Sequence, residues 1–202
     1  MLDARLRPLI DPPLNALGRR LAAAGVSADA MTFAGFGLGL AAALAIAFGQ
    51  FLPGAGLIVL NRLADGLDGA IARATRKTDR GGYLDIVLDF AFYGAVPLAF
   101  ILADPARNAV AGAALLLAFH VNGASFLGFA AIAARRGIET ASHGEKSLYF
   151  TAGLAEGAET IAVFLAFCAF PGAFAPLAYG FSALTAITAA SRIALACRHF
   201  AD

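Results

Sequence analysis

The chain has 202 residues, of which 60% are hydrophobic and 14% charged, with a net charge of +1. A mean hydropathy of +0.75 and apolar runs of about 20 residues exceed what a soluble core needs and are typical of membrane helices. The near-zero net charge provides no field that would attract nucleic acid, and two cysteines without characteristic spacing exclude a disulfide framework or a cysteine metal site. The length fits a single domain over residues 1–202.

The first 25 residues favour a short amphipathic segment that lies in the membrane interface. Residues 3–24 alternate Leu and Ile with Arg and Asp, and they contain no continuous apolar core such as a signal peptide needs. We expect Pro12 and Pro13 to break this segment, because proline removes a backbone donor and clashes with the preceding helical turn.

Six apolar stretches follow, separated by polar or Gly- and Pro-containing turns, and they predict six membrane-spanning helices. The predicted ranges are 30–49, 54–76, 83–103, 107–133, 146–169 and 176–197. The expected fold class is therefore all-α, a six-transmembrane-helix bundle preceded by the interfacial segment. Thirteen of the fifteen basic residues fall at the N-terminus, the C-terminus and the even-numbered connections, so the positive-inside rule places both termini on the cytoplasmic side.

An acidic stretch, LADGLDGAIARATRKTDRGGYLDIVLD, crosses the turn between the second and third predicted helices. Asp65 and Asp68 lie three residues apart on one helix, and Asp85 and Asp89 lie four apart on the next, so each pair shares a helix face. Because the turn brings the two helices side by side, all four carboxylates can converge. Their mutual repulsion and desolvation require one or two divalent cations, and oxygen-only ligands suit magnesium, manganese or calcium rather than zinc.

Small and basic residues beside these acids are suited to an anionic ligand. Gly69 and Ala72 leave room for a ligand to approach, as do Gly81 and Gly82 in the turn, and Arg73 can neutralise a diphosphate. A metal ion held by carboxylates, with glycines beside it and basic residues at the edge of the site, is typical of a site that binds a phosphate or diphosphate. These features do not by themselves identify the nucleotide, the lipid or the reaction.

The spacing D-x2-D-G-x2-A-R-x7-G-x3-D-x3-D, from Asp65 to Asp89, resembles the signature of the CDP-alcohol phosphatidyltransferases, integral membrane enzymes of phospholipid synthesis. The resemblance implies that Asp65, Asp68 and Asp85 ligate one or two Mg²⁺ (or Mn²⁺) ions on the diphosphate of a CDP-linked lipid. Asp89 would also ligate metal and act as general base. The implied residues of the CDP pocket are Thr32, Gly66, Gly69, Ala72, Arg73 and Gly81.

The implied reaction is attack of an alcohol on the lipid-side phosphorus of CDP-diacylglycerol, with CMP leaving and a phosphodiester lipid formed. For Thr32 the alternative is that its hydroxyl only satisfies its own helix terminus. The alcohol itself stays open among glycerol 3-phosphate, inositol, inositol phosphate, serine, choline and another phospholipid.

Four polar residues outside the motif are candidates for the acceptor site: Arg135, Lys146, Glu156 and Arg192. Lys146 and Arg192 could grip a phosphate on the acceptor, which favours a phosphorylated alcohol such as glycerol 3-phosphate. Arg135 is equally well explained as loop charge that follows the positive-inside rule.

Two charged residues lie deeper in the predicted bundle. Arg62 and Glu159 are each roughly 20 Å from the cytoplasmic helix ends, at a depth where an unpaired charge is costly. We expect them to form an ion pair beneath the acid cluster, the alternative being that Arg62 pairs only with Asp65.

The expected location is a bacterial inner membrane, and a homodimer is expected through one of two small-residue faces, Gly35-x3-Gly39 or Gly153-x3-Gly157. The alternative function is a transporter that binds cations with its intramembrane carboxylates. The acids cluster in one half of the membrane and no inverted repeat is visible, which argues against that alternative.

Overall fold

The computed structural model describes residues 2–137 and 157–201, and within these ranges the chain is helical with no strand, which confirms the all-α class. The helices are α1 (Leu2–Ala23), α2 (Ala28–Ala47), α3 (Phe51–Ala74), α4 (Asp79–Ala103), α5 (Pro105–Arg135), α6 (Gly157–Ala169), the short 3-10 helix η1 (Pro171–Ala173) and α7 (Phe174–His199). The predicted fifth helix, 146–169, is described only from residue 157 onward.

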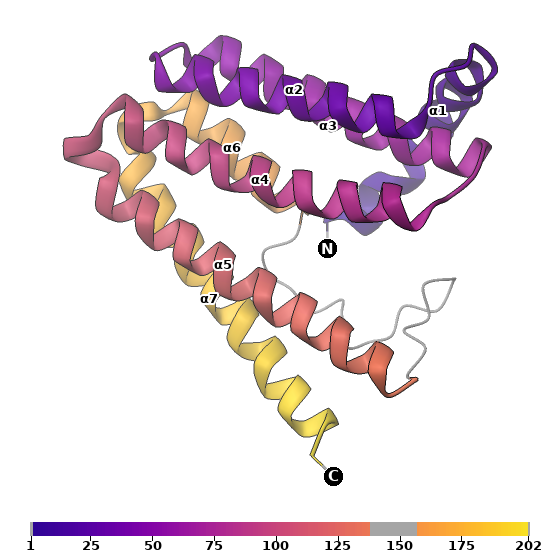
Figure 1. Ribbon diagram of the computed structural model, residues 1–202. Coiled ribbons are helices and arrows are strands. Elements are labelled where there is room, and N and C mark those ends of the chain that lie inside the picture. The colour runs from indigo at the N-terminus through magenta and orange to yellow at the C-terminus, as the bar shows by residue number, and fades with distance from the viewer. Residues whose placement is uncertain (1, 138–156, 202) are drawn as a thin grey trace.

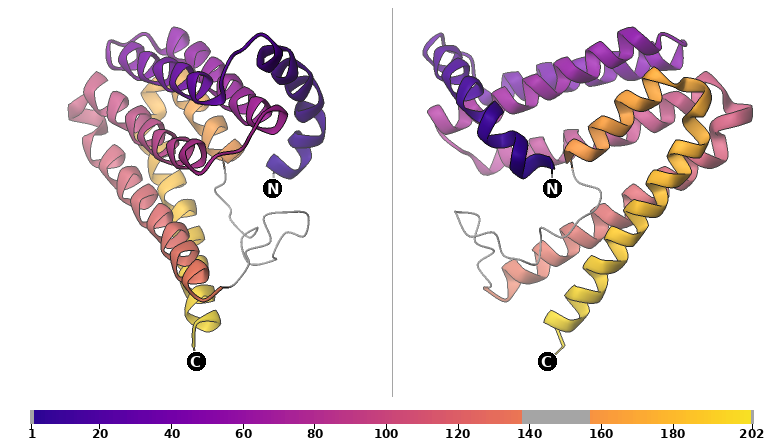
Figure 2. Two further views of the ribbon diagram at one scale, coloured as in Figure 1. Left: turned by 45° about the vertical axis from the view of Figure 1, so that its right-hand side comes forward. Right: turned by 180° about the vertical axis from the view of Figure 1, so that it is seen from behind.

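Helix α2 packs against both α3 and α4, and α1 lies across one end of this group against α3 (Figure 1). Helices α5 and α7 pack along each other, and their C-terminal halves diverge from α2–α4, as both views of Figure 2 show. Helix α6 packs against α3. The carboxylate motif on α3 and α4 therefore lies in the compact α2–α4 part of the molecule.

Local capping explains where several helices begin. The Ser27 hydroxyl accepts a hydrogen bond from the Ala30 N–H at α2, the Thr78 hydroxyl accepts one from Gly81 at α4, and Asp104 accepts one from Arg107 at α5. Gly25 follows α1 with a φ of 85°, a left-handed conformation that suits glycine. Because Thr78 caps α4, that helix begins four residues before the predicted start at 83.

The expected break at Pro12 and Pro13 is wrong, because α1 runs continuously through Pro8, Pro12 and Pro13. All three prolines are exposed. Proline leaves the carbonyl four residues earlier without its helical donor, and on an exposed helix face water or lipid headgroups can satisfy that carbonyl.

Six helices, α2–α7, follow α1, but the predicted count of six spanning helices needs correction. Within the described ranges, four helices are long and apolar enough to cross a membrane: α2, α4, α5 and α7 together with η1. Helix α3 does not qualify, since it carries the polar stripe of Arg62, Asp65, Asp68 and Arg73, and the described part of α6 has 13 residues. Large apolar side chains on the outer surfaces, such as Leu44, Leu52 and Val110, are exposed, as lipid-facing residues would be.

Gly35 and Gly39 are buried inside the chain, where they bring α2 close to α3 and α4. A Cβ on Gly35 would lie 3.1 Å from the Ala64 Cβ, and one on Gly39 would lie 2.7 Å from Phe92 Cδ2. The small-residue face expected to serve a dimer is therefore used for packing within one chain. Gly153, of the other proposed face, lies outside the described residues.

Phenylalanines from α4, α6 and α7 make up much of the hydrophobic core. Phe100 stacks on Phe174 with ring centroids 4.8 Å apart, and Phe167 meets Phe174 edge to face at 4.8 Å. Phe92 and Phe164 continue the cluster along α4 toward its N-terminal half. Phe92 thus connects the core to the polar site that α3 and α4 form.

Candidate metal and substrate site

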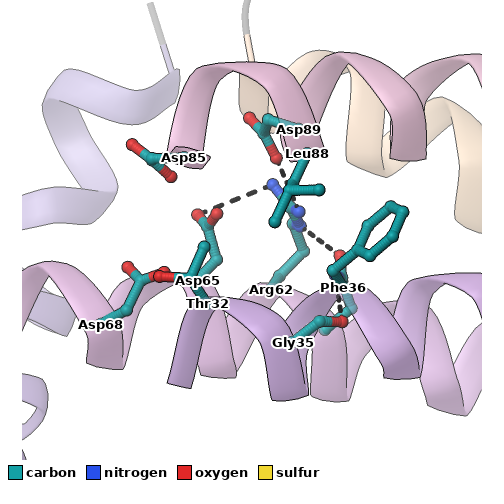
Figure 3. A pocket seen from close by; sticks show the side chains of 10 residues that line it. Thr32, Gly35, Phe36, Arg62, Asp65, Asp68, Asp85, Leu88 and Asp89 are labelled. Carbon is teal, nitrogen blue, oxygen red and sulfur yellow. Dashed lines mark hydrogen bonds and ion pairs between the residues drawn. The ribbon is translucent and has the colours of Figure 1, made fainter. Parts of the chain in front are cut away.

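A polar pocket opens between α2, α3 and the N-terminal half of α4. Figure 3 shows the motif aspartates facing one another across it, with Asp65 and Asp68 from α3 and Asp85 and Asp89 from α4. Its remaining lining residues are Thr32, Gly35, Phe36, Asn61, Arg62 and Leu88. The turn between α3 and α4 therefore brings the two acidic pairs together, as the sequence predicted.

Three of the four carboxylates form a tight group. One oxygen each of Asp65, Asp68 and Asp85 lies within 4.8 Å of the other two. Asp68 is buried, and its Oδ2 atom has no hydrogen-bond partner among the described residues. A buried carboxylate oxygen that lacks a donor, beside two further carboxylates, fits a hard divalent cation with oxygen ligands.

Asp89 lies in the same pocket but has a cationic partner of its own. Its Oδ1 atom is 2.8 Å from Arg62 Nη2, and Arg62 Nη1 is 3.6 Å from Asp65 Oδ2. The predicted Arg62–Glu159 pair is therefore wrong, and Asp65, the alternative, is one of two acidic partners. Counting residues along helices gives the depth of a side chain but not its direction around the axis, and Arg62 points toward α4.

Asn61 is a site residue that the sequence analysis missed. It is 3% exposed, its amide nitrogen donates to the Gly35 carbonyl at 2.8 Å, and its Oδ1 accepts from Arg62 Nε at 2.7 Å. The Arg62 guanidinium also lies over the Phe92 ring, 4.6 Å from its centroid. The signal in the sequence that could have identified Asn61 is its place beside Arg62 within an otherwise apolar run.

The residues implied for the CDP pocket are distributed around the acid cluster. Thr32 lines the pocket beside Asp68, and its hydroxyl donates to the Ala28 carbonyl at 3.0 Å, so it also satisfies its own helix. A Cβ on Gly69 would lie 3.2 Å from Arg73 Nη1, and one on Gly81 would lie 3.1 Å from Thr78 Oγ1. Ala72 is half-buried.

Arg73 and Gly66 contact α1 rather than the pocket wall. Arg73 donates from Nη2 and Nε to the Asn15 side-chain oxygen, at 2.9 and 3.1 Å. A Cβ on Gly66 would lie 2.7 Å from Leu14 Cδ1. Helix α1 is therefore joined to the motif helix α3 at two motif positions.

Two of the four acceptor candidates fall within the described residues. Lys146 and Glu156 lie outside the described residues. Arg135 is exposed at the end of α5, and Arg192 on α7 donates from Nη1 to Asn122 Oδ1 at 3.0 Å. Neither arginine lines the pocket, since the C-terminal halves of α5 and α7 diverge from α2–α4 (Figure 2).

Comparisons with known proteins agree with this geometry. The family model of CDP-alcohol phosphatidyltransferase matches residues 26–196. The inner membrane protein YnjF of Escherichia coli (strain K12) is 48% identical over 193 residues, which cover 96% of this chain and 94% of YnjF. An archaetidylinositol phosphate synthase of Methanothermobacter thermautotrophicus is 34% identical over 163 residues, 80% of this chain and 74% of that protein.

Two solved structures share the fold. They are Mycobacterium tuberculosis phosphatidylinositol phosphate synthase (PgsA1) with CDP-DAG bound and the same protein in complex with manganese and citrate. Each is 23% identical with a TM-score of 0.67; the matches cover 91% of this chain and 93% and 88% of those chains. The four apolar helices and the similarity to the inner membrane protein YnjF together indicate that the chain is a multi-pass membrane protein.

Proposed function

We propose that this chain, which belongs to the CDP-alcohol phosphatidyltransferase family, transfers a phosphatidyl group from CDP-diacylglycerol to a phosphorylated alcohol and releases CMP. The observation that carries the proposal is the convergence of Asp65, Asp68 and Asp85, from two helices, to within 4.8 Å. Carboxylates gathered in this way at the edge of a membrane bundle suit a cation-bridged diphosphate.

In this proposal Asp65, Asp68 and Asp85 hold Mg²⁺, with Mn²⁺ as the alternative. When bound, the ion supplies positive charge against the donor diphosphate. Arg73, which donates to Asn15 of α1, would donate to a diphosphate oxygen instead. Gly69 and Gly81 leave room for the nucleotide, because no side chain projects from either position.

Asp89 is the proposed general base. Arg62 holds its carboxylate at the pocket wall, where it can accept the proton of the incoming hydroxyl. As the alcohol oxygen bonds to the lipid-side phosphorus, the bond from that phosphorus to the bridging oxygen breaks. CMP leaves with the bonding electrons, and the proton stays on Asp89.

The acceptor is proposed to carry a phosphate. Support comes from the relatives named archaetidylinositol phosphate synthases and from the basic residue Lys146 near the predicted cytoplasmic end of its helix, which favour an anionic alcohol. Inositol phosphate and glycerol 3-phosphate are the two candidates. Inositol and glycerol serve as their unphosphorylated counterparts in the assay.

Purified protein in detergent micelles with CDP-diacylglycerol and Mg²⁺ tests the reaction, with chromatographic detection of CMP. We expect CMP release with a phosphorylated acceptor and a loss of roughly 10²-fold or more in Asp89→Asn, since a positioned general base contributes about 10²–10⁴-fold. Asp79→Asn, an exposed aspartate on the same helix, is the matched control and should retain activity. Absence of CMP with every acceptor, or full activity in Asp89→Asn, would contradict the proposal.

The proposed setting is a bacterial inner membrane, with residues 1–202 as one domain, both termini on the cytoplasmic side and a homodimer as the assembly. The support for the location and the sidedness is the distribution of basic residues and the relative named an inner membrane protein. Reporter fusions at each terminus test the sidedness, and light scattering of the purified protein tests the dimer. Reporter signals that place either terminus outside the cytoplasm would contradict the sidedness, and the mass of a monomer would contradict the dimer.

A further inference from the structure

We propose that Arg62 is a built-in cation of the acid cluster, which takes the place of a second divalent ion beside Asp89. The cluster then binds one divalent cation, at Asp65, Asp68 and Asp85, and Arg62 acts as a positioning residue for Asp89. This inference rests on the proposed function only in taking the cluster as a metal site.

The Arg62 guanidinium lies between the carboxylates of Asp89 and Asp65, where a second divalent ion would have to fit. Arg62 Nη2 lies 2.8 Å from Asp89 and Nη1 lies 3.6 Å from Asp65 (Figure 3). A metal shared by these two acids would need to lie about 2.1 Å from an oxygen of each, directly against the guanidinium. Like charges at that separation repel strongly where water is excluded. The oxygens that converge closely enough to hold an ion accordingly belong to Asp65, Asp68 and Asp85, whereas Asp89 pairs with Arg62.

The surrounding structure holds Arg62 in this place. Its Nε donates to Asn61 Oδ1 at 2.7 Å, and Asn61 is itself fixed by its hydrogen bond to the Gly35 carbonyl at 2.8 Å. The face of the guanidinium lies over Phe92, which is 1% exposed and part of the core. Because an arginine keeps its charge in proteins, the cation cannot leave by deprotonation. One side chain is thus anchored by α2, α3 and α4 together.

The same contacts give Arg62 a role in orienting Asp89. An ion pair with a fixed guanidinium, 2.8 Å from Asp89 Oδ1, restricts where the carboxylate lies, and the planar guanidinium has a geometry that lysine does not reproduce. Loss of the guanidinium should therefore affect the rate of the chemical step more than the binding of the CDP-lipid.

Titration of the purified, metal-free protein with Mn²⁺, followed by electron paramagnetic resonance of free Mn²⁺, tests the inference without relying on activity. We expect one bound ion per chain in the wild type and two in Arg62→Gln. Arg62→Met, which keeps an apolar stem against Phe92, replaces Arg62→Gln if that variant does not fold. Arg80→Gln removes a cation that pairs with Asp29 at 3.5 Å outside the cluster, and it should bind one ion like the wild type.

Arg62→Lys separates charge from geometry. It should still bind one Mn²⁺, while kcat falls about tenfold, a part of what a positioned base contributes, and KM for CDP-diacylglycerol changes less than about threefold. Two equivalent ions in the wild type, or a single ion in both Arg62→Gln and Arg62→Met, would overturn the inference. One bound ion without CMP release would overturn the proposed function and leave the role of Arg62 intact.

Discussion

At Gly39 the lack of a side chain lets α2 approach the two residues that support Arg62. A Cβ there would lie 2.7 Å from Phe92 Cδ2 and 3.1 Å from Asn61 Nδ2, both tighter than ordinary contact. Phe92 is part of the packed core, and Asn61 is fixed to the Gly35 carbonyl, so neither can shift freely.

Gly39→Ala should therefore destabilise the protein, by about 1–3 kcal/mol as is usual for overpacking. Gly37→Ala, two residues away on the same helix, is the control, because a Cβ there has no neighbouring atom within 4 Å among the described residues. Alanine is a better helix former than glycine, so Gly37→Ala should unfold at the same or a higher temperature. Thermal unfolding in detergent measures both; equal loss in the two variants would contradict the packing described for Gly39.

The aspartates of the site could be predicted from the sequence, but their cationic partner could not. Spacings of three and four residues fix which carboxylates share a helix face, and the short turn brings Asp65 and Asp68 opposite Asp85. The partner of Arg62 depends on which way a long side chain points between helices, which residue spacing does not determine. Asn61 escaped attention because a neutral amide gives only a weak signal in a hydropathy pattern.

The contact between α1 and α3 joins the N-terminal helix to the motif helix. A Cβ on Gly18 would lie 2.6 Å from the Ala70 Cβ and 2.9 Å from its backbone carbon, so the two helices are in close contact there. Asn15, one turn away, accepts both hydrogen bonds from Arg73. Arg73 has two candidate roles, to hold α1 in place and to bind the diphosphate.

Paired substitutions distinguish these roles. If Arg73 binds the diphosphate as proposed, Arg73→Gln should lower kcat/KM for CDP-diacylglycerol by about tenfold or more, since charge-assisted bonds to phosphate are among the stronger hydrogen bonds. Asn15→Ala removes only the contact with α1 and should change kcat/KM less than about threefold. Steady-state kinetics of both variants decides the matter; equal losses would indicate that Arg73 serves only to hold α1.

Helix ends were predicted well where caps or turns define them. The ranges 30–49 and 54–76 lie within three residues of α2 and α3. The prediction failed at Pro12 and Pro13, because the cost of a proline in a helix depends on whether the freed carbonyl is exposed, and here both prolines lie on the exposed face.

For the whole molecule, apolar periodicity predicted the helices but not their arrangement. In the described ranges six helices, α2–α7, follow α1, yet α3 carries too many charges to qualify as a span and uses its polar stripe to line a pocket. The divergence of α5 and α7 from α2–α4, visible in Figure 1, leaves Arg135 and Arg192 away from the acids. Residue spacing within single helices holds no information on such angles between helices.

Crystals of the protein grown with Mn²⁺ test most directly whether acids from α3 and α4 share a divalent ion. We expect an anomalous peak about 2.1 Å from carboxylate oxygens of Asp65, Asp68 and Asp85. A Mn²⁺ ion bound only elsewhere, or electron density in which these three side chains point away from one another, would contradict the shared site and the transfer chemistry built on it.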